Sequence, residues 1–429
     1  MAQPLIIRGY LVSIGYACLT IGVRDTDFKS CMLKNVSEAK LIELIGHNLH
    51  SLEKVIDYNL ANRINLFRIS SDLIPFGSSP ANPLPWEEIF SAQLQQIGLK
   101  IKQSGMRVSM HPGQYTVLNS PDAGVVSRAM EDLTYHARVL DSLGTDVKHK
   151  IVLHIGGVYN DKEKAINRFI SHCRQLDPAV KRRLVPENDD RSYSIEEVLE
   201  IGTRLKAPVV FDNLHHAINP SADKMSDADW IKQCQKTWQS GDGRQKIHYS
   251  QQNKEKKPGS HSDTIEINEF MHFYDSVAGD NLDVMLEVKD KNLSALKCIN
   301  CTAADKSIKY LEKEWSRYKY TVLERSPAAY QEIRRLLRIK TEYPALAFYT
   351  TLEAALQSPL ETGHAINAAQ HVWGYFKDVA TANEKETFLK NINHYQSGNT
   401  GNGSLKKYLW KMAVKYRCSY LLDAYYFIF

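Results

Sequence analysis

The sequence predicts an α/β fold, a (β/α)₈ TIM barrel, followed by a small all-α C-terminal domain. Eight short apolar runs alternate with segments of helical periodicity up to about residue 290, and this βα repeat is the building unit of the barrel. A doubly wound open sheet is the alternative, and it usually carries a G-x-G-x-x-G loop after its first strand. The corresponding turn here, Gly15-Tyr-Ala-Cys-Leu-Thr-Ile-Gly22, lacks that pattern, which favours the barrel.

The individual elements follow from the period of the apolar residues. Short apolar runs predict strands at 11–16, 64–69, 106–110, 150–153, 183–186, 209–211, 245–247 and 282–286. Apolar residues every three or four positions, such as Leu41, Leu44 and Ile45, predict helices. These helices lie at 37–62, 86–105, 124–143, 162–176, 194–205, 230–238 and 265–276. Because the run Val209 to Phe211 is apolar throughout, we expect it to be a strand buried on both faces.

Beyond about residue 300 the pattern changes to consecutive helices. We therefore expect two domains, a barrel over residues 1–300 and a helical domain over residues 301–429. The helical domain contains a glycine-rich break at 398–403. We expect its late aromatic residues to form core rather than DNA contacts; they are Tyr408, Trp410, Tyr425, Tyr426 and Phe427.

Composition restricts the class of protein. Of 429 residues, 43% are hydrophobic and 24% charged, which is typical of a soluble globular protein. We expect no membrane span and no signal peptide, because no apolar run is long enough and residues 1–8 lack the required pattern.

Seven scattered cysteines suggest free thiols and a cytoplasmic location. Cys298 and Cys301 have the C-x-x-C spacing that supplies half of a zinc site, but no second C-x-x-C or H-x-x-x-H follows. The net charge of +5 permits a polyanionic partner without requiring one.

Metal-ligating side chains follow the apolar runs of strands three to eight. They are His111, His154, Glu187, Asp212, His248 and Glu287. Since the carboxyl ends of barrel strands meet at one mouth, we expect these side chains to converge. Imidazole and carboxylate ligands suit Mn²⁺, Zn²⁺ or Fe²⁺, and this set exceeds what one tetrahedral ion uses. We therefore expect two or three divalent ions, with Glu187 bridging two of them.

Three further residues extend this hypothesis. His215 and His261 lie just past strand ends and could hold another ion. Lys246 precedes His248 by two residues and therefore faces the same side of the strand. There it would contact a carboxylate or a phosphate, or be chemically modified. The alternative is structural: the ring residues would cap helices or pair with cations, and Lys246 would form an ion pair in the barrel core.

Clustered divalent ions without a cofactor motif favour phosphoester hydrolysis, because one ion can generate hydroxide while another stabilises the leaving oxygen. Sugar isomerisation on a metal-binding barrel is the competing chemistry. It would use about four ligands rich in carboxylates and a pocket walled by aromatics. The number of histidines in the present set favours the hydrolase.

Several motifs together resemble the UV damage endonuclease family over roughly residues 8–295. They are Phe67-Arg-Ile-Ser-Ser-Asp-Leu-Ile-Pro-Phe76, His111-Pro-Gly-Gln-Tyr115, Leu153-His-Ile-Gly-Gly157, Pro186-Glu-Asn-Asp189, Phe211-Asp-Asn-Leu-His-His216 and Pro258-Gly-Ser-His261. The resemblance implies a fold and metal arrangement like those of endonuclease IV. It also implies that double-stranded DNA is nicked immediately 5′ of ultraviolet photoproducts, leaving a 3′-hydroxyl and a 5′-phosphate.

The same resemblance implies roles for individual residues. One ion would be held by Glu187, Asp212, His248 and Glu287, a second by His111, His154 and Glu187, and a third by His215 and His261. Catalysis would depend on Glu187, Asp212, His248 and Glu287, and we expect Lys246 to contribute because of its position two residues before His248. Gln114 and Tyr115 would probe the damaged dinucleotide, and Tyr16 would face the substrate. One departure is Ser79, which occupies a position where some members carry histidine.

We expect Mn²⁺ as the metal, with Zn²⁺ as the alternative, and we expect a monomer. An abasic-site endonuclease, a metal-dependent sugar isomerase and a non-catalytic damage-binding scaffold are the competing functions. Residues 318–326 and 371–377 resemble an uncharacterised helical domain, which implies no activity.

Overall fold

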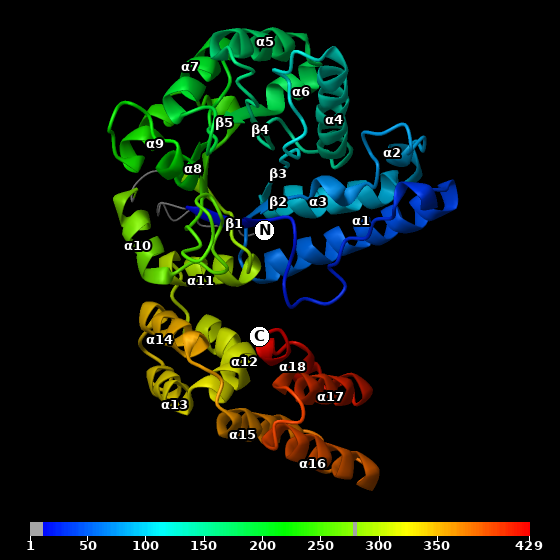
Figure 1. Ribbon diagram of the computed structural model, residues 1–429, viewed down its shortest axis with the longest axis vertical. Helices are drawn as coiled ribbons and strands as arrows, with labels where there is room; N and C mark the ends of the chain where they lie inside the picture. Colours follow the sequence, from blue (N-terminus) through cyan, green and yellow to red (C-terminus); the bar gives the residue numbers. More distant parts are fainter. Residues whose placement is uncertain (1–11, 278–280) are drawn as a thin grey trace, which may run out of the picture. The chain divides into compact units, whose positions relative to one another are not determined.

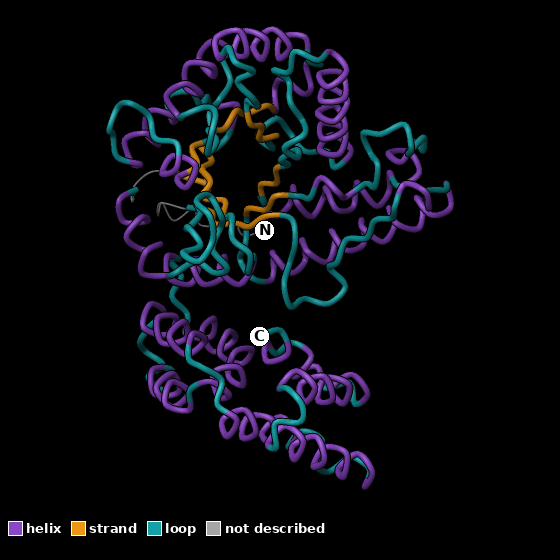
Figure 2. Tube along the Cα trace, in the orientation of Figure 1, coloured by secondary structure: helices purple, strands orange, loops and turns teal. Residues whose placement is uncertain are grey.

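The structure, a computed structural model, describes residues 12–277 and 281–429. Its strands are β1 Ser13–Ala17, β2 Leu66–Arg68, β3 Arg107–Ser109, β4 Ile151–His154, β5 Leu184–Glu187, β6 Phe211–Asp212, β7 Gln245–Tyr249 and β8 Leu282–Leu286. All pair in parallel, in the orders β3-β2-β1-β8-β7-β6 and β4-β5. Single bridges from Met110 to Ile151 and from Glu187 to Val210 join the two sheets. The strands therefore close into a ring, which Figure 2 shows surrounded by helices.

The helices that follow the strands form the outer layer of the barrel (Figure 1). They are α1 Glu38–Ala61, α2 Trp86–Ile89, α3 Ser91–Ser104, α4 Ala123–Ser142, α5 Lys162–Gln175, α6 Pro178–Arg183, α7 Ile195–Leu205, α8 Asn213–Ile218, α9 Asp227–Gln235, α10 Ile267–Ser276 and α11 Asn292–Thr302. Many begin at a side-chain cap, such as Ser37 before α1 and Asp122 before α4. The expected (β/α)₈ architecture is confirmed.

The details differ from the sequence-based expectations at a few places. The described part of the first strand begins at Ser13, and Leu11, where we expected it to start, lies outside the described residues. The helix expected at 86–105 is interrupted at Phe90, whose backbone leaves the helical region. Helices α6 and α8 were not expected, because six residues are too few to show a helical period.

Alternation along the strands decides which side chains enter the barrel. Ala17, Leu66 and Met285 pack together in one cluster. Arg68 follows Leu66 by two residues and faces the same side, whereas Phe67 faces the opposite side and packs edge-on against Tyr16. Since residues at the C-terminal ends of the strands share one rim, the register of the strands sets the positions of the site residues.

The chain divides into two compact units. The first extends to Ile265 and includes His272–Ile299; the second comprises Glu266–Met271 and Asn300–Phe429. The second unit is helical, with α12 Ile308–Arg325, α13 Pro327–Leu336, α14 Ala345–Gln357, α15 Thr362–Trp373, α16 Ala382–Gln396, α17 Asn402–Lys415 and α18 Ser419–Leu422. Its apolar core includes Leu323, Val372, Phe376 and Leu409. No described helix has both the length and the apolar composition needed to span a bilayer.

Candidate metal centre

The strand register places the expected ligands opposite one another at one rim of the barrel. His154, the last residue of β4, pairs with Glu187, the last residue of β5. Asp212, the last residue of β6, pairs with His248 in β7. Neighbouring strands thus present their ligands at the same height, and the rim collects donors from different parts of the chain.

Glu187 lies at the centre of this cluster and is fully buried. Its Oε2 atom is 3.0 Å from Nε2 of His111 and 2.9 Å from Nε2 of His154. Its Oε1 atom is 2.5 Å from Nδ1 of His248. One carboxylate therefore contacts imidazoles from three different strand ends.

Three groups of side chains could each hold a metal ion. They are His111 with Glu187 and His248, His154 with Glu187 and His215, and Asp212 with His248 and Glu287. Within each group the ligand atoms lie within 4.8 Å of one another. Glu187 and His248 each belong to two groups, so neighbouring ions would share ligands. The remaining expected ligand, His261, places Nε2 3.6 Å from Oε2 of Glu287.

The hydrogen bonding of His111 fits a bound cation. Its Nδ1 atom lies 3.1 Å from the carbonyl oxygen of Pro112, which can only accept, so Nδ1 carries the proton. Burial lowers the pKa of His111 to about 4 although Glu187 opposes the shift, and the ring is therefore neutral near pH 7. The lone pair of Nε2 then faces a carboxylate oxygen, and a cation between these two acceptors removes their repulsion.

Two buried atoms support the same interpretation. Among the described residues, Oδ2 of Asp212 and Nε2 of His248 are buried without a hydrogen-bond partner. Unsatisfied buried polar atoms are costly, and both atoms belong to one of the three groups described above. A divalent cation would satisfy both atoms, so the residues fit a metal.

The electrostatics of the cluster keep two carboxylates ionised. Burial would raise the pKa of Glu187, but the His248 charge and the hydrogen bonds from His154 and His248 outweigh it and hold the pKa well below its usual value. Burial likewise opposes ionisation of Glu287, but Arg68 and His248 lower its pKa. For Asp212, burial prevails over the attraction of His215, and its pKa is raised.

Arg68 and Asn188 were not identified from the sequence. Arg68 ends β2 and forms an ion pair with Glu287. The pattern of metal-ligating residues covers the ends of strands three to eight, so it gives no signal for an arginine at the end of the second strand. Asn188 accepts from the backbone N–H of Asp212 at 2.9 Å and its carbonyl oxygen lies 2.9 Å from Nδ1 of His215. This contact orients His215 so that Nε2 is the free ring nitrogen.

Lys246 lies apart from the three groups. It is buried, and the charged groups around it include Arg107 and Asp283. Arg107 pairs with Asp283, whose β8 strand lies beside β7. Burial, reinforced by Arg107, lowers the pKa of Lys246 well below its usual value. Lys246 therefore shares the inward face with His248 but lies one layer deeper, among charged residues of the barrel core.

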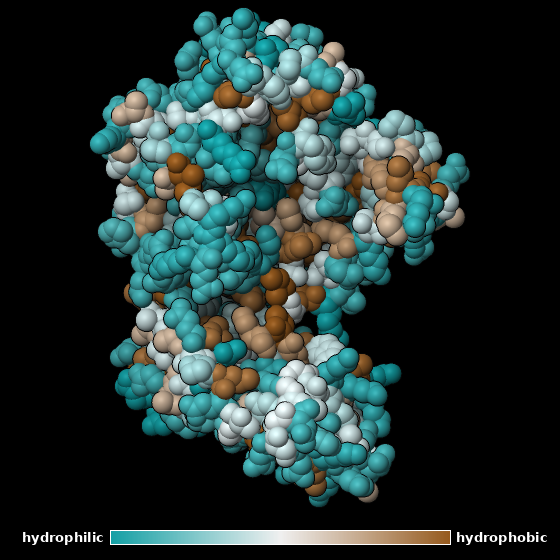
Figure 3. All heavy atoms as spheres, viewed as in Figure 1, coloured by the Kyte–Doolittle hydropathy of each residue, from teal (hydrophilic) through white to brown (hydrophobic). Residues whose placement is uncertain are grey.

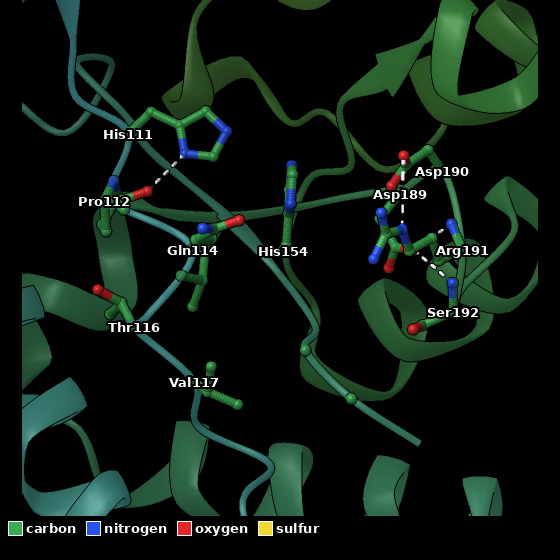
Figure 4. A pocket seen from close by; sticks show the side chains of 14 residues that line it. His111, Pro112, Gln114, Thr116, Val117, His154, Asp189, Asp190, Arg191 and Ser192 are labelled. Carbon is green, nitrogen blue, oxygen red and sulfur yellow. Dashed lines mark hydrogen bonds and ion pairs between the residues drawn. The ribbon is translucent and has the colours of Figure 1, made fainter. Parts of the chain in front are cut away.

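The residues that we expected to contact the substrate differ in their exposure to solvent. Tyr115 is 68% exposed, and Gln114 is also exposed. Gln114, His111 and His154 line one cavity of about 290 Å³. Figure 4 shows these side chains from close by. Arg191 also lines this cavity and lies across it from His111 in this view.

Tyr16 differs from the expectation. Its side chain is fully buried, and its hydroxyl donates to Oδ1 of Asn59 on α1 at 2.8 Å. The register of β1 with β2 pairs Tyr16 with Phe67 and turns both rings towards the helix layer. The expected contact of Tyr16 with a substrate is therefore not supported by this placement. Ser79, the residue that departs from the family pattern, lines a second cavity together with Tyr115.

Comparisons with known proteins relate both parts of the chain to described families. Residues 12–319 match the family model of UV-endonuclease UvdE, and residues 319–429 match a protein of unknown function, DUF1722. The UV DNA damage endonuclease of Clostridium perfringens is 39% identical over 386 residues, covering 89% of this chain and 92% of that protein. That of Bacillus cereus is 33% identical over 279 residues, covering 64% and 87%.

A solved structure shows the same fold. The crystal structure of SacUVDE is 39% identical in sequence and matches with a TM-score of 0.65, covering 71% of this chain and 100% of that chain. The Clostridium alignment, at 386 residues, is longer than the barrel unit, which ends at Ile299. The similarity to that relative therefore extends into the helical unit.

Proposed function

Because the chain belongs to the UV-endonuclease UvdE family, we propose that it is a metal-dependent DNA repair endonuclease. It cuts the phosphodiester bond immediately 5′ of ultraviolet photoproducts, both cyclobutane pyrimidine dimers and 6-4 photoproducts. The products are a 3′-hydroxyl and a 5′-phosphate. The substrate is double-stranded DNA that contains the lesion.

The observation that carries this proposal is the set of three donor groups joined by Glu187 and His248. These groups would hold two or three divalent ions, with His261 completing a third site beside His215. The mixture of imidazole and carboxylate ligands suits both Mn²⁺ and Zn²⁺, and of these we propose Mn²⁺. Such ions supply a hydroxide nucleophile at neutral pH and stabilise the departing oxygen.

The protein side chains position these components. Glu187 is held by three imidazoles, so its two oxygens have fixed directions. The carbonyl oxygen of Asn188 fixes the ring of His215. Lys246 would act on the site from the layer below, through the charged residues Arg107 and Asp283 around it.

Recognition of the lesion would take place at the rim. Tyr115 is exposed next to a cavity of about 360 Å³, and Gln114 lines the cavity that contains His111 and His154. A planar ring at this position could fill the gap left by an extruded dinucleotide. Because a damaged, weakly stacked dinucleotide costs less to unstack and bend than intact duplex, deformation would contribute to specificity.

Mapping of strand incision on irradiated duplex tests this function. We expect a single nick 5′ of each photoproduct with Mn²⁺, no nick with chelator, and none with Glu187→Gln. A duplex with an abasic site distinguishes the related abasic-site activity. Equal or faster cutting of the abasic duplex would contradict the assignment to photoproducts, and metal-independent cutting would contradict the proposed centre.

We also propose that residues 1–300 form the nuclease domain and residues 301–429 a separate helical domain. The protein would act as a monomer in the cytoplasm. The seven cysteines, all free thiols, support a reducing compartment. The mass of the purified full-length protein by light scattering tests the monomer, and a dimer mass would contradict it.

A further inference from the structure

The C-terminal segment 300–429 of the helical unit carries the positive charge of the chain. Residues 300–429 contain 18 lysines and arginines against 12 aspartates and glutamates, whereas the whole chain contains 54 and 49. The remainder of the chain is therefore close to neutral. A basic unit of this kind has a surface suited to a polyanion.

A group of tyrosines from distant segments meets in this unit. Tyr375 and Tyr420 stack with ring centroids 5.6 Å apart and planes inclined by 10°. The hydroxyl of Tyr320 on α12 donates to that of Tyr375 at 2.9 Å. Tyr375 is 42% exposed, whereas Tyr425 and Tyr426 are buried in the core as expected from the sequence. The Tyr375–Tyr420 pair is therefore a stack with accessible aromatic surface.

Cations adjoin these rings. The Nζ atom of Lys319 lies 4.6 Å from the ring centroid of Tyr320 and 4.7 Å from that of Tyr420. Arg334 on α13 lies 5.7 Å from the ring of Tyr330, which packs against Trp315. Within the described chain, neither Lys319 nor Arg334 has a carboxylate within ion-pair distance, unlike Arg335, which pairs with Glu332.

We propose that this surface, made of Trp315, Lys319, Tyr330, Arg334, Tyr375 and Tyr420, binds single-stranded DNA. An unpaired base can extend the Tyr375–Tyr420 stack, and Lys319 and Arg334 can neutralise backbone phosphates. Aromatic stacking combined with cations is how proteins bind single strands without sequence preference. A duplex keeps its bases stacked on one another, so it can use the cations but not the rings.

Binding of single-stranded DNA at this surface does not require nuclease activity, so an equilibrium binding assay can test it. Fluorescence anisotropy with a labelled oligothymidine is measured on the full chain in chelator, for wild type, Tyr375→Ala, Tyr375→Phe and Lys319→Gln. Lys390→Gln on α16, an exposed lysine outside the surface, is the matched control. Thermal unfolding of each variant verifies that it is folded.

We expect Tyr375→Ala to weaken binding roughly tenfold and Tyr375→Phe to bind like wild type, because the ring and not the hydroxyl stacks. Lys319→Gln should reduce the slope of log affinity against log salt concentration by about one, which corresponds to one phosphate contact. Lys390→Gln should leave this slope unchanged. Binding of intact duplex should be insensitive to Tyr375→Ala. An equal loss for duplex and single strand would overturn the proposal, because the surface would then be purely electrostatic.

Photocrosslinking locates the contact independently. An oligonucleotide containing bromodeoxyuridine is irradiated with the full chain, and the modified peptides are identified by mass spectrometry. We expect crosslinks in the peptides that contain Tyr375 or Tyr420. Crosslinks confined to peptides of the barrel, with unchanged affinity of Tyr375→Ala, would show that the helical unit does not bind the strand.

Discussion

The Nδ1 atom of His248 lies 2.5 Å from Oε1 of Glu187, although β6 separates the strands that carry them. The contact therefore spans the interior of the barrel rather than a neighbouring pair of strands. It leaves Nε2 of His248 buried without a hydrogen-bond partner among the described residues. This arrangement makes Glu187 the residue on which the whole candidate centre depends.

Replacement of Glu187 tests this dependence. We expect Glu187→Gln to lower the rate of nicking by more than about a hundredfold, which exceeds the usual effect of changing a residue that only supports a metal ligand. The fold should persist, because the side chains have the same shape. Glu200→Gln, on the exposed side of α7, is the matched control. A mutant rate near that of wild type would rule out the central role of Glu187.

Metal content provides a second prediction. Protein stripped with chelator and reloaded with Mn²⁺ should retain two to three equivalents, as measured by elemental analysis after desalting. Glu187→Gln should retain fewer, because the carboxylate belongs to two of the donor groups. Retention of less than one equivalent by wild type would contradict a polynuclear centre.

The pH dependence of stability follows from His215. Burial lowers its pKa, but the negative charges of Asp212, Glu187 and Glu287 prevail and raise it from 6.5 to about 9. The metal-free folded protein therefore holds a proton that the unfolded chain releases above pH 6.5. This stabilisation is complete below about pH 6.5 and is lost as the pH rises to about 9.

We expect the melting temperature of the metal-free protein to fall over this range, and His215→Asn to make the fall shallower. His50→Asn, an exposed residue of α1, is the control. In the loaded protein the metal should replace the proton, so adding Mn²⁺ at pH 7.5 should release protons. If the melting temperatures of wild type and His215→Asn fell equally steeply with pH, the raised pKa of His215 would be contradicted.

The ion pair between Arg68 and Glu287 yields a prediction about stability. Arg68→Met leaves a buried carboxylate without its cation, which typically costs about 3–5 kcal/mol. Bound Mn²⁺ would supply the missing positive charge, so the increase in melting temperature on loading should be larger for Arg68→Met than for wild type. Arg68→Lys, which keeps the charge, should lie between them. If loading raised the melting temperature of Arg68→Met and of wild type equally, Arg68 would not be coupled to the metal centre.

Tyr115 tests lesion recognition separately from catalysis. Because its side chain is 68% exposed, Tyr115→Ala should change the free energy of unfolding by no more than about 0.5 kcal/mol. It should reduce the preference for irradiated over intact duplex while metal content stays constant. Tyr115→Phe keeps the ring and should retain the preference. Parallel loss of preference and metal content would contradict a role in recognition.

The sequence was sufficient to predict the barrel and the convergence of the candidate ligands at its rim, because buried parallel strands are apolar and end abruptly. His154 and Glu187 could be found in this way, since each ends such a run. The direction of Tyr16 could not, because it depends on the pairing of β1 with β2, which is a tertiary property. Asn188 acts through its backbone carbonyl and side-chain amide, and no residue pattern reveals such a contact in advance.

His154 pairs in register with Glu187, and Asp212 pairs in register with His248. This register restricts where residues can be inserted in the chain. Insertion of one residue within any of these strands would turn its donor outwards, towards the helices. Insertions after the strands, or at the opposite rim, leave the pairing intact. Differences in length should therefore concentrate in the connecting loops, where insertions can reshape the surface around the site without moving its donors.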